Sequence, residues 1–142
     1  MNLEKISEKL NAPEKIKGKI LIVEDELSVA NFIDDVAALL GYETRILTTG
    51  KKVVEVAKEW KPNLITLDVM IPAPDGLQVL AELKEDPATR AIPVFIVSAV
   101  TGNPEFSGRF GKAEKVFQKP LVLSSFLEEV EKLFKGSNLE NG

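Results

Sequence analysis

The chain of 142 residues contains no cysteine and no histidine. Without cysteine it forms no disulfide bond and offers no thiolate as a ligand or nucleophile. Without histidine it can hold no Ser-His-Asp triad, no zinc ion bound through imidazole and no phosphohistidine. Any chemistry must therefore come from carboxylates, hydroxyls, lysines and the backbone.

Long apolar runs and clusters of basic residues are also missing. No stretch approaches the ~18 apolar residues that a membrane-spanning helix needs, and the first residues lack a signal-peptide core. The net charge of −4, with no basic patch, argues against binding to nucleic acid. We therefore expect a cytoplasmic protein that binds neither membranes nor nucleic acid.

Short apolar runs alternate with segments in which apolar residues recur at helical spacing. The runs 20–23 and 64–67 are free of charge and mostly β-branched or leucine, which is typical of strands buried on both faces. The segment 123–135 is a clear example of the helical period. We expect strands near 20–23, 42–47, 63–67, 92–97 and 115–118, and helices near 27–40, 51–60, 77–85 and 123–135.

Five strands joined by connections of helix length predict a parallel sheet with right-handed crossovers, hence one doubly wound α/β domain. We place this domain at residues 19–135. Residues 1–18 carry apolar residues at helical spacing before a proline, and we expect an N-terminal extension or linker there. The composition of residues 136–142 predicts a flexible tail.

Three acids follow two of the predicted strands. Glu24 and Asp25 come directly after the first strand, and Asp68 follows the third. The carboxyl ends of parallel strands meet at one edge of the sheet, which is where ligands bind in such folds. Carboxylates that crowd together repel one another unless a cation joins them. The sequence therefore predicts a divalent metal site at this edge.

Four motifs occur in order at the predicted strand ends: ILIVEDE at 20–26, LDVMIPAPDG at 67–76, VSA at 97–99 and Lys119-Pro120. Together they resemble the signature of response-regulator receiver domains of two-component signalling, similar to the chemotaxis regulator, over roughly residues 18–135. The resemblance implies a flavodoxin-like fold with helices on both faces of a five-stranded parallel sheet, in strand order 2-1-3-4-5.

The resemblance also implies a role for each matching residue. Asp68 would accept a phosphoryl group, which a carboxylate ionised near neutral pH can do without a general base. Lys119 would contact the phosphoryl oxygens, with the peptide to Pro120 commonly cis, and Ser98 would be the hydroxyl that responds to phosphorylation. Magnesium would be held by Glu24, Asp25, Asp68 and the backbone carbonyl of Met70.

Glu26 and the loop at 72–76 have simpler interpretations. An acid at the start of the helix near 27–40 suits the helix macrodipole, so we expect Glu26 to serve there. The proline, aspartate and glycine of the loop suit a turn into the next helix.

The chain departs from the receiver pattern in three places. Val116 occupies the position where receivers usually carry an aromatic residue, and its neighbour Phe117 must face the other side of the strand. The segment 101–114, where a helix is usual, contains three glycines and a proline, so we expect a short, frayed or irregular helix. The resemblance implies that Met70 and Val100 occupy positions flanking the site that influence how fast the phosphoryl group is lost; both are apolar here and cannot orient a water molecule, which predicts a long-lived phosphorylated form.

These observations give a leading function and two alternatives. The leading one is a phosphorelay module that takes a phosphoryl group from a histidine kinase or a histidine phosphotransfer domain. Its output would be an unknown partner protein, or an effector or kinase domain outside this chain. A receiver that binds partners without phosphorylation is the first alternative. The second, a magnesium-dependent phosphatase of the haloacid-dehalogenase type, lacks the required acid at Met70.

Overall fold

The structure of the chain, a computed structural model, describes residues 16–102, 104 and 108–141. Five strands form one sheet in the order β2-β1-β3-β4-β5, and every neighbouring pair is parallel. This arrangement confirms the predicted flavodoxin-like order. The strands are β1 (Gly18–Val23), β2 (Tyr42–Leu47), β3 (Leu64–Leu67), β4 (Val94–Ser98) and β5 (Lys115–Gln118).

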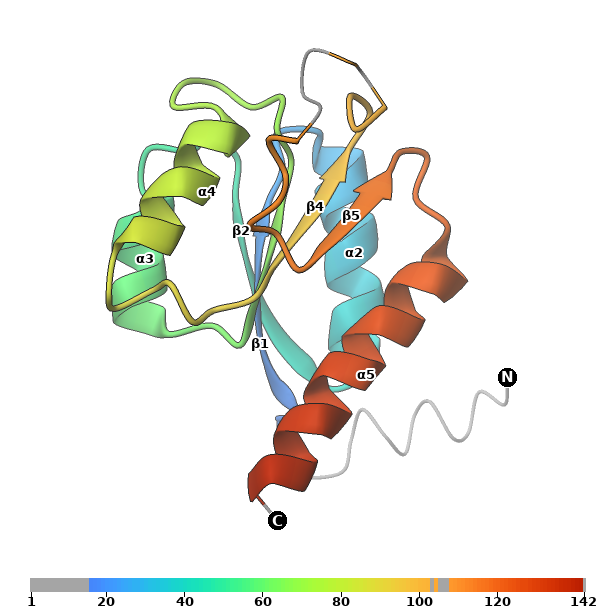
Figure 1. Cartoon of the computed structure of the whole chain (residues 1–142). Coiled ribbons are helices and arrows are strands. Elements are labelled where there is room, and N and C mark those ends of the chain that lie inside the picture. The colour runs from blue at the N-terminus through green and yellow to red at the C-terminus, as the bar shows by residue number, and fades with distance from the viewer. Residues whose placement is uncertain (1–15, 103, 105–107, 142) are drawn as a thin grey trace.

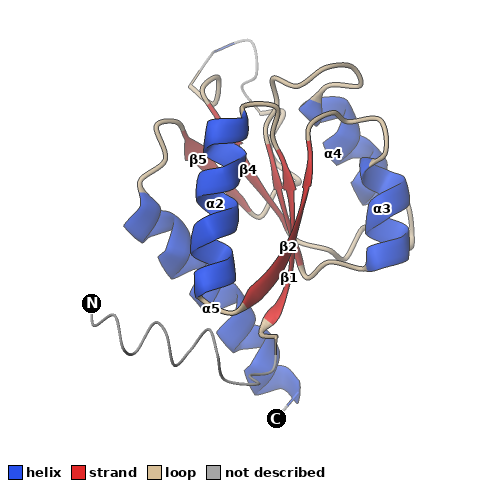
Figure 2. Ribbon diagram, turned by 180° about the vertical axis from the view of Figure 1, so that it is seen from behind, coloured by secondary structure: helices blue, strands red, loops and turns tan. Residues whose placement is uncertain are grey.

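Helices cover both faces of the sheet (Figures 1 and 2). Helices α2 (Leu27–Leu39) and α5 (Leu123–Asn141) lie on one face, and α3 (Val53–Trp60) and α4 (Gly76–Glu85) lie on the other. Within the described residues no helix is both long and apolar enough to cross a membrane.

The central strands have two buried faces, which explains their uninterrupted apolar runs. In β1, Ile20 and Ile22 join the core under α2 and α5, whereas Leu21 and Val23 join the core under α3 and α4. All four side chains are at most 1% exposed. The alternation follows from the two-residue period of a strand, and it leaves no charged residue in β1 between Lys19 and Glu24.

Several element boundaries differ from the prediction, most clearly those of β4 and α5. Strand β4 begins at Val94 rather than at residue 92, because Pro93 has no N–H group to donate to a neighbouring strand. Helix α5 continues to Asn141, through the segment predicted as a flexible tail. The division into extension, domain and tail stays a prediction, since residues 1–15 lie outside the described part of the chain.

Between β4 and β5, the described residues form turns rather than a regular helix, and side chains hold them in place. Residues 99–102 and 108–112 lie in turns, and Phe110 packs against the core under α3 and α4. Glu114 anchors the end of the segment: it accepts hydrogen bonds from Lys84 Nζ at 2.9 Å and from the Val94 backbone N–H at 2.5 Å. The glycines of this segment make a helix costly, but residues 103 and 105–107 of the predicted irregular helix lie outside the described part of the chain.

Candidate functional site

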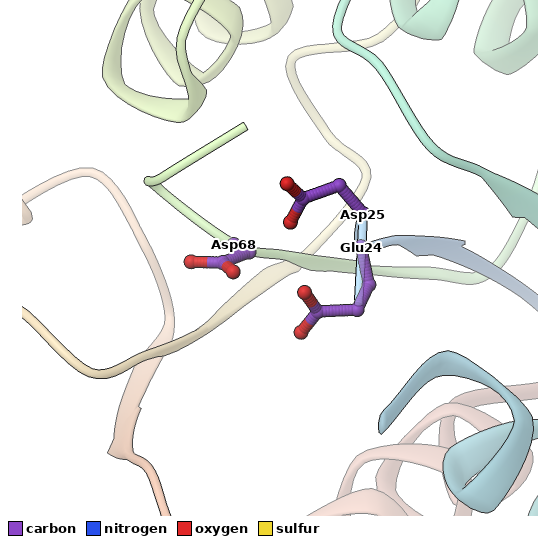
Figure 3. Close-up of side chains that lie close together, drawn as sticks. All are labelled: Glu24, Asp25 and Asp68. Carbon is purple, nitrogen blue, oxygen red and sulfur yellow. The ribbon is translucent and has the colours of Figure 1, made fainter. Parts of the chain in front are cut away.

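The strand register brings the predicted acids together. Val23 and Leu67 are partners in the pairing of β1 with β3, so the residues that follow them leave the sheet side by side. The Asp68 N–H donates to the Val23 carbonyl at 3.0 Å, which continues the pairing by one residue. Oxygen atoms of Glu24, Asp25 and Asp68 all lie within 4.8 Å of one another. Figure 3 shows these three side chains at the two strand ends.

The three acids differ in their exposure. Glu24 and Asp68 are only 2% and 4% exposed, whereas Asp25 is exposed at the mouth of the site. Buried carboxylates are costly unless a cation or hydrogen-bond donors compensate them. The set fits Mg²⁺, which prefers oxygen ligands and keeps several water molecules. Two buried acids and one at the surface leave a side open to such water.

Lys119 reaches into this cluster from the end of β5. Its Nζ lies 2.7 Å from Glu24 Oε1 and 3.0 Å from Asp68 Oδ2, and its side chain is 11% exposed. The Lys119 N–H donates to the Ser98 carbonyl at 3.1 Å, and the Lys119–Pro120 peptide is cis. Burial alone would lower the pKa of Lys119, but its hydrogen bonds to the carboxylates hold that pKa above the usual range.

Glu24 holds its proton more tightly than an ordinary carboxyl, chiefly because it is buried. Burial, followed by its hydrogen bond and charge repulsion with Asp68, raises the pKa of Glu24 from 4.5 to about 7, although Lys119 and the Glu26 N–H oppose this shift. Because the carboxyl still binds a proton near neutral pH, Lys119 alone does not fully stabilise its ionised form, and a divalent cation would stabilise that form further. A divalent ion in the cluster would release that proton.

Asp68 is oriented by the loop that follows β3. The Met70 N–H donates to Asp68 Oδ1 at 3.1 Å, a contact that no pattern in the sequence predicts. A Cβ atom on Gly76 would overlap the Asp68 carbonyl oxygen, so this close approach requires glycine. Asp75 caps α4 by accepting from the Gln78 N–H at 2.9 Å. The loop therefore fixes the backbone that follows the acceptor.

Ser98 is the last residue of β4 and is fully buried. Within the described part of the chain, no atom forms a hydrogen bond with its Oγ. A buried hydroxyl without a partner is unfavourable, so Ser98 has a free donor for a group that enters the site. This matches the role that the receiver resemblance implies for it.

Glu26 is the residue whose role the sequence did not reveal. It is the N-cap of α2, yet its side chain makes no capping hydrogen bond. Instead its Oε1 lies 3.1 Å from Lys119 Nζ. The contact joins residues distant in the chain, and no local pattern identifies it.

The comparisons with known proteins agree with this geometry. The sequence profile of the response regulator receiver domain matches residues 20–131. The chain belongs to the response regulator receiver domain family. It is 36% identical over 115 residues to the polar-differentiation response regulator DivK of Brucella anthropi, which covers 79% of this chain and 92% of that protein.

Solved receiver domains share the fold. The signal receiver domain of a histidine kinase from Syntrophus aciditrophicus is 30% identical, with a TM-score of 0.77 over 84% of this chain and 91% of that one. A receiver domain of a sensor histidine kinase from Pseudomonas aeruginosa has a TM-score of 0.76 at 19% identity, covering 83% of this chain and 98% of that one. That second domain holds a magnesium ion in its active site cleft. Our protein is thus a receiver module of two-component signalling.

One departure from the receiver pattern is explained by the faces of β5. Val116 is 43% exposed, whereas Phe117 points into the core with ring centroids 5.6 Å from Phe95 and 5.4 Å from Phe126. The prediction that Phe117 faces the other side of the strand from Val116 is therefore confirmed. A change of side-chain position at this site of β5 would therefore involve the aliphatic Val116 instead of an aromatic ring.

Proposed function

We propose that this receiver accepts a phosphoryl group on Asp68 from the phosphohistidine of a histidine kinase or histidine phosphotransfer domain. The observation that carries the proposal is the position of Asp68, which is buried between Lys119 and the acid pair at the mouth of the sheet. The alternative of a receiver that works without phosphorylation is not favoured, because acceptor, acid pair and lysine are all in place.

Each residue has a part in the transfer. An Asp68 carboxylate oxygen forms a bond to phosphorus while the phosphorus–nitrogen bond of the donor breaks, and the electron pair returns to the ring nitrogen. The imidazole leaves as a neutral ring when its other nitrogen carries a proton. Lys119 offers its ammonium to the phosphoryl oxygens, and Ser98 offers its unpaired hydroxyl.

Mg²⁺ would be held by Glu24, Asp25, Asp68 and the Met70 backbone carbonyl. When bound, the ion would neutralise charge between the acceptor and the phosphoryl oxygens. The fit rests on the oxygen donors gathered at one place and on the raised pKa of Glu24. The Met70 carbonyl is carried over from the receiver pattern.

We further propose that the chain catalyses only its own phosphorylation and dephosphorylation. A phosphatase of the haloacid-dehalogenase type needs an acid where this chain has Met70, whose side chain is 59% exposed and apolar. The output partner would be another protein or domain. A cytoplasmic location belongs to this proposal, since that is where a kinase would act on such a module.

Beryllofluoride, a phosphoryl mimic, tests the site without a cognate kinase. We expect it to raise the unfolding temperature of the protein only together with Mg²⁺. Asp68→Asn and Asp25→Asn should abolish this gain, whereas Asp35→Asn, an equal change of charge at an exposed position of α2, should keep it. A gain that persists in Asp68→Asn would contradict the proposal.

A further inference from the structure

Glu26 has a side chain that the helix it precedes does not use. Its carbonyl accepts from the N–H groups of Val29 and Ala30 at 3.1 and 3.0 Å, which starts α2 through the backbone. Its carboxylate turns away from the helix and contacts Lys119 Nζ at 3.1 Å. The Glu26 side chain is therefore free of any capping role and interacts with the site instead.

Among the three carboxylates on Lys119, Glu26 is the one that can leave easily. The Glu26 side chain is 60% exposed, compared with 3% for Glu24 and 4% for Asp68. Releasing Glu26 returns its charge to water, whereas releasing either buried acid would strand a charge in the protein. The Glu26–Lys119 pair is thus the weak contact of the cluster.

The pair also lines a cavity at the edge of the site. Glu26 and Lys119 both line this cavity of about 610 Å³, and Lys119 connects it to the acceptor because its Nζ lies 3.0 Å from Asp68 Oδ2. Its other lining residues are mostly apolar: Ser28, Val29, Phe32, Ala99, Pro120 and Leu121. A donor that approaches Asp68 from this cavity meets the Glu26 charge before Lys119 is free. The Glu26 carboxylate repels an anionic donor, whereas the Lys119 ammonium attracts it.

We propose that Glu26 is a positioning residue that occupies the Lys119 ammonium in the unphosphorylated site and gives it up when a phosphoryl group arrives. This inference rests on the proposed phosphorylation of Asp68. The consequence is a slower uptake of phosphoryl groups from small anionic donors than the site would show without Glu26.

The rate of phosphorylation by acetyl phosphate, followed by intact mass at saturating Mg²⁺, tests this role. Glu26→Gln should raise the second-order rate constant by about two- to fivefold at low salt, the range expected for an exposed ion pair. The gain should be present at about 0.01 M salt and absent at about 1 M, where the Debye length falls from ~30 Å to ~3 Å. A purely structural effect would not follow the salt concentration.

Two further variants separate contact from charge. Glu26→Asp keeps the charge but shortens the arm, so it should lose the contact and react faster than wild type. Asp35→Asn removes the same charge from α2 roughly 13 Å further along the helix, and should match wild type. Equal rates for wild type and Glu26→Gln, or for wild type and Glu26→Asp, would overturn the inference.

The pair can also be tested without any phosphorylation. In a double-mutant cycle of Glu26→Gln and Lys119→Met, we expect the shifts in urea unfolding midpoint to be non-additive. Additive shifts would show that Glu26 and Lys119 do not interact. That result would overturn the role inferred for Glu26 but would leave the function proposed for Asp68 intact. A wild-type protein that takes up no phosphoryl group at all would instead refute the function proposed for Asp68, and with it the rate effect of Glu26.

Discussion

Replacing Lys119 by methionine should destabilise the metal-free protein, because two buried carboxylates then lose their cation. Coulomb's law with an effective dielectric constant of ~20 gives roughly 5 kcal/mol for an ion pair at such distances. Desolvation of the ammonium offsets part of this, and removing one partner of a buried pair costs ~3–5 kcal/mol. The exposed contact to Glu26 adds little. We therefore expect a loss of about 3 kcal/mol at pH 8.

The loss should shrink at lower pH, because Glu24 can then take up a proton. Its pKa is already raised to about 7 in the wild type, and removing the ammonium raises it further. Between its ordinary value of 4.5 and this raised value, the folded state binds more protons than the unfolded state. The protonated Glu24 therefore makes its full contribution to the free energy of unfolding below pH 4.5. This contribution is lost as the pH rises from 4.5 through about 7. Each pH unit in that window is worth up to ~1.4 kcal/mol.

Urea unfolding in the presence of a chelator, followed through Trp60, gives the measurement. Trp60 is the one tryptophan of the chain, and it is 8% exposed at the end of α3, so its emission reports on the core. Lys132→Met, which removes a charge of the same sign from the surface of α5, should leave the midpoint unchanged at both pH values. An equal loss for Lys119→Met at pH 8 and pH 5.5, or no loss at all, would refute this reasoning.

Three further predictions concern other residues. Burial and the nearby Glu131 carboxylate raise the pKa of Tyr42 to about 12, so absorbance of this single tyrosine at alkaline pH should titrate near 12 in the folded protein and ~10 in the unfolded one; its contribution to stability is present below pH 10 and lost above it, and a folded-state midpoint at 10 would contradict this. Gly76→Ala should lower the unfolding midpoint and weaken beryllofluoride binding together, because the added Cβ would overlap the acceptor's carbonyl; an unchanged affinity would refute the close approach. With apolar Met70 and Val100 beside the site, the phosphorylated protein should persist for minutes or longer by intact mass, and decay within seconds would refute this.

The sheet could be predicted from the sequence because strands buried on both faces consist of uninterrupted apolar runs. Runs such as 20–23 and 64–67 lie between two helical layers, so no polar face interrupts them. Once these runs are parallel, the acids after them must meet, and the register of Val23 with Leu67 is what brings Glu24 and Asp68 together. The predicted site therefore follows from the predicted fold.

Contacts between distant segments could not be predicted in this way. The Glu26–Lys119 pair depends on the orientation of two side chains from separate strand ends, and an acid before a helix has a simpler local explanation. The described turns at 101–102 and 108–112 show the same limit. The glycines of this segment argue against a helix, but the anchoring of Glu114 to Lys84 and Val94 follows only from the folded arrangement.

Intact mass after incubation with acetyl phosphate shows whether Asp68 is the phosphoryl acceptor. We expect the addition of one phosphoryl group that requires Mg²⁺, maps to Asp68 and is absent from Asp68→Asn. Asp35→Asn, with the same change of charge at an exposed position, should be modified like wild type. Modification that persists in Asp68→Asn, or that proceeds equally well without Mg²⁺, would contradict the account.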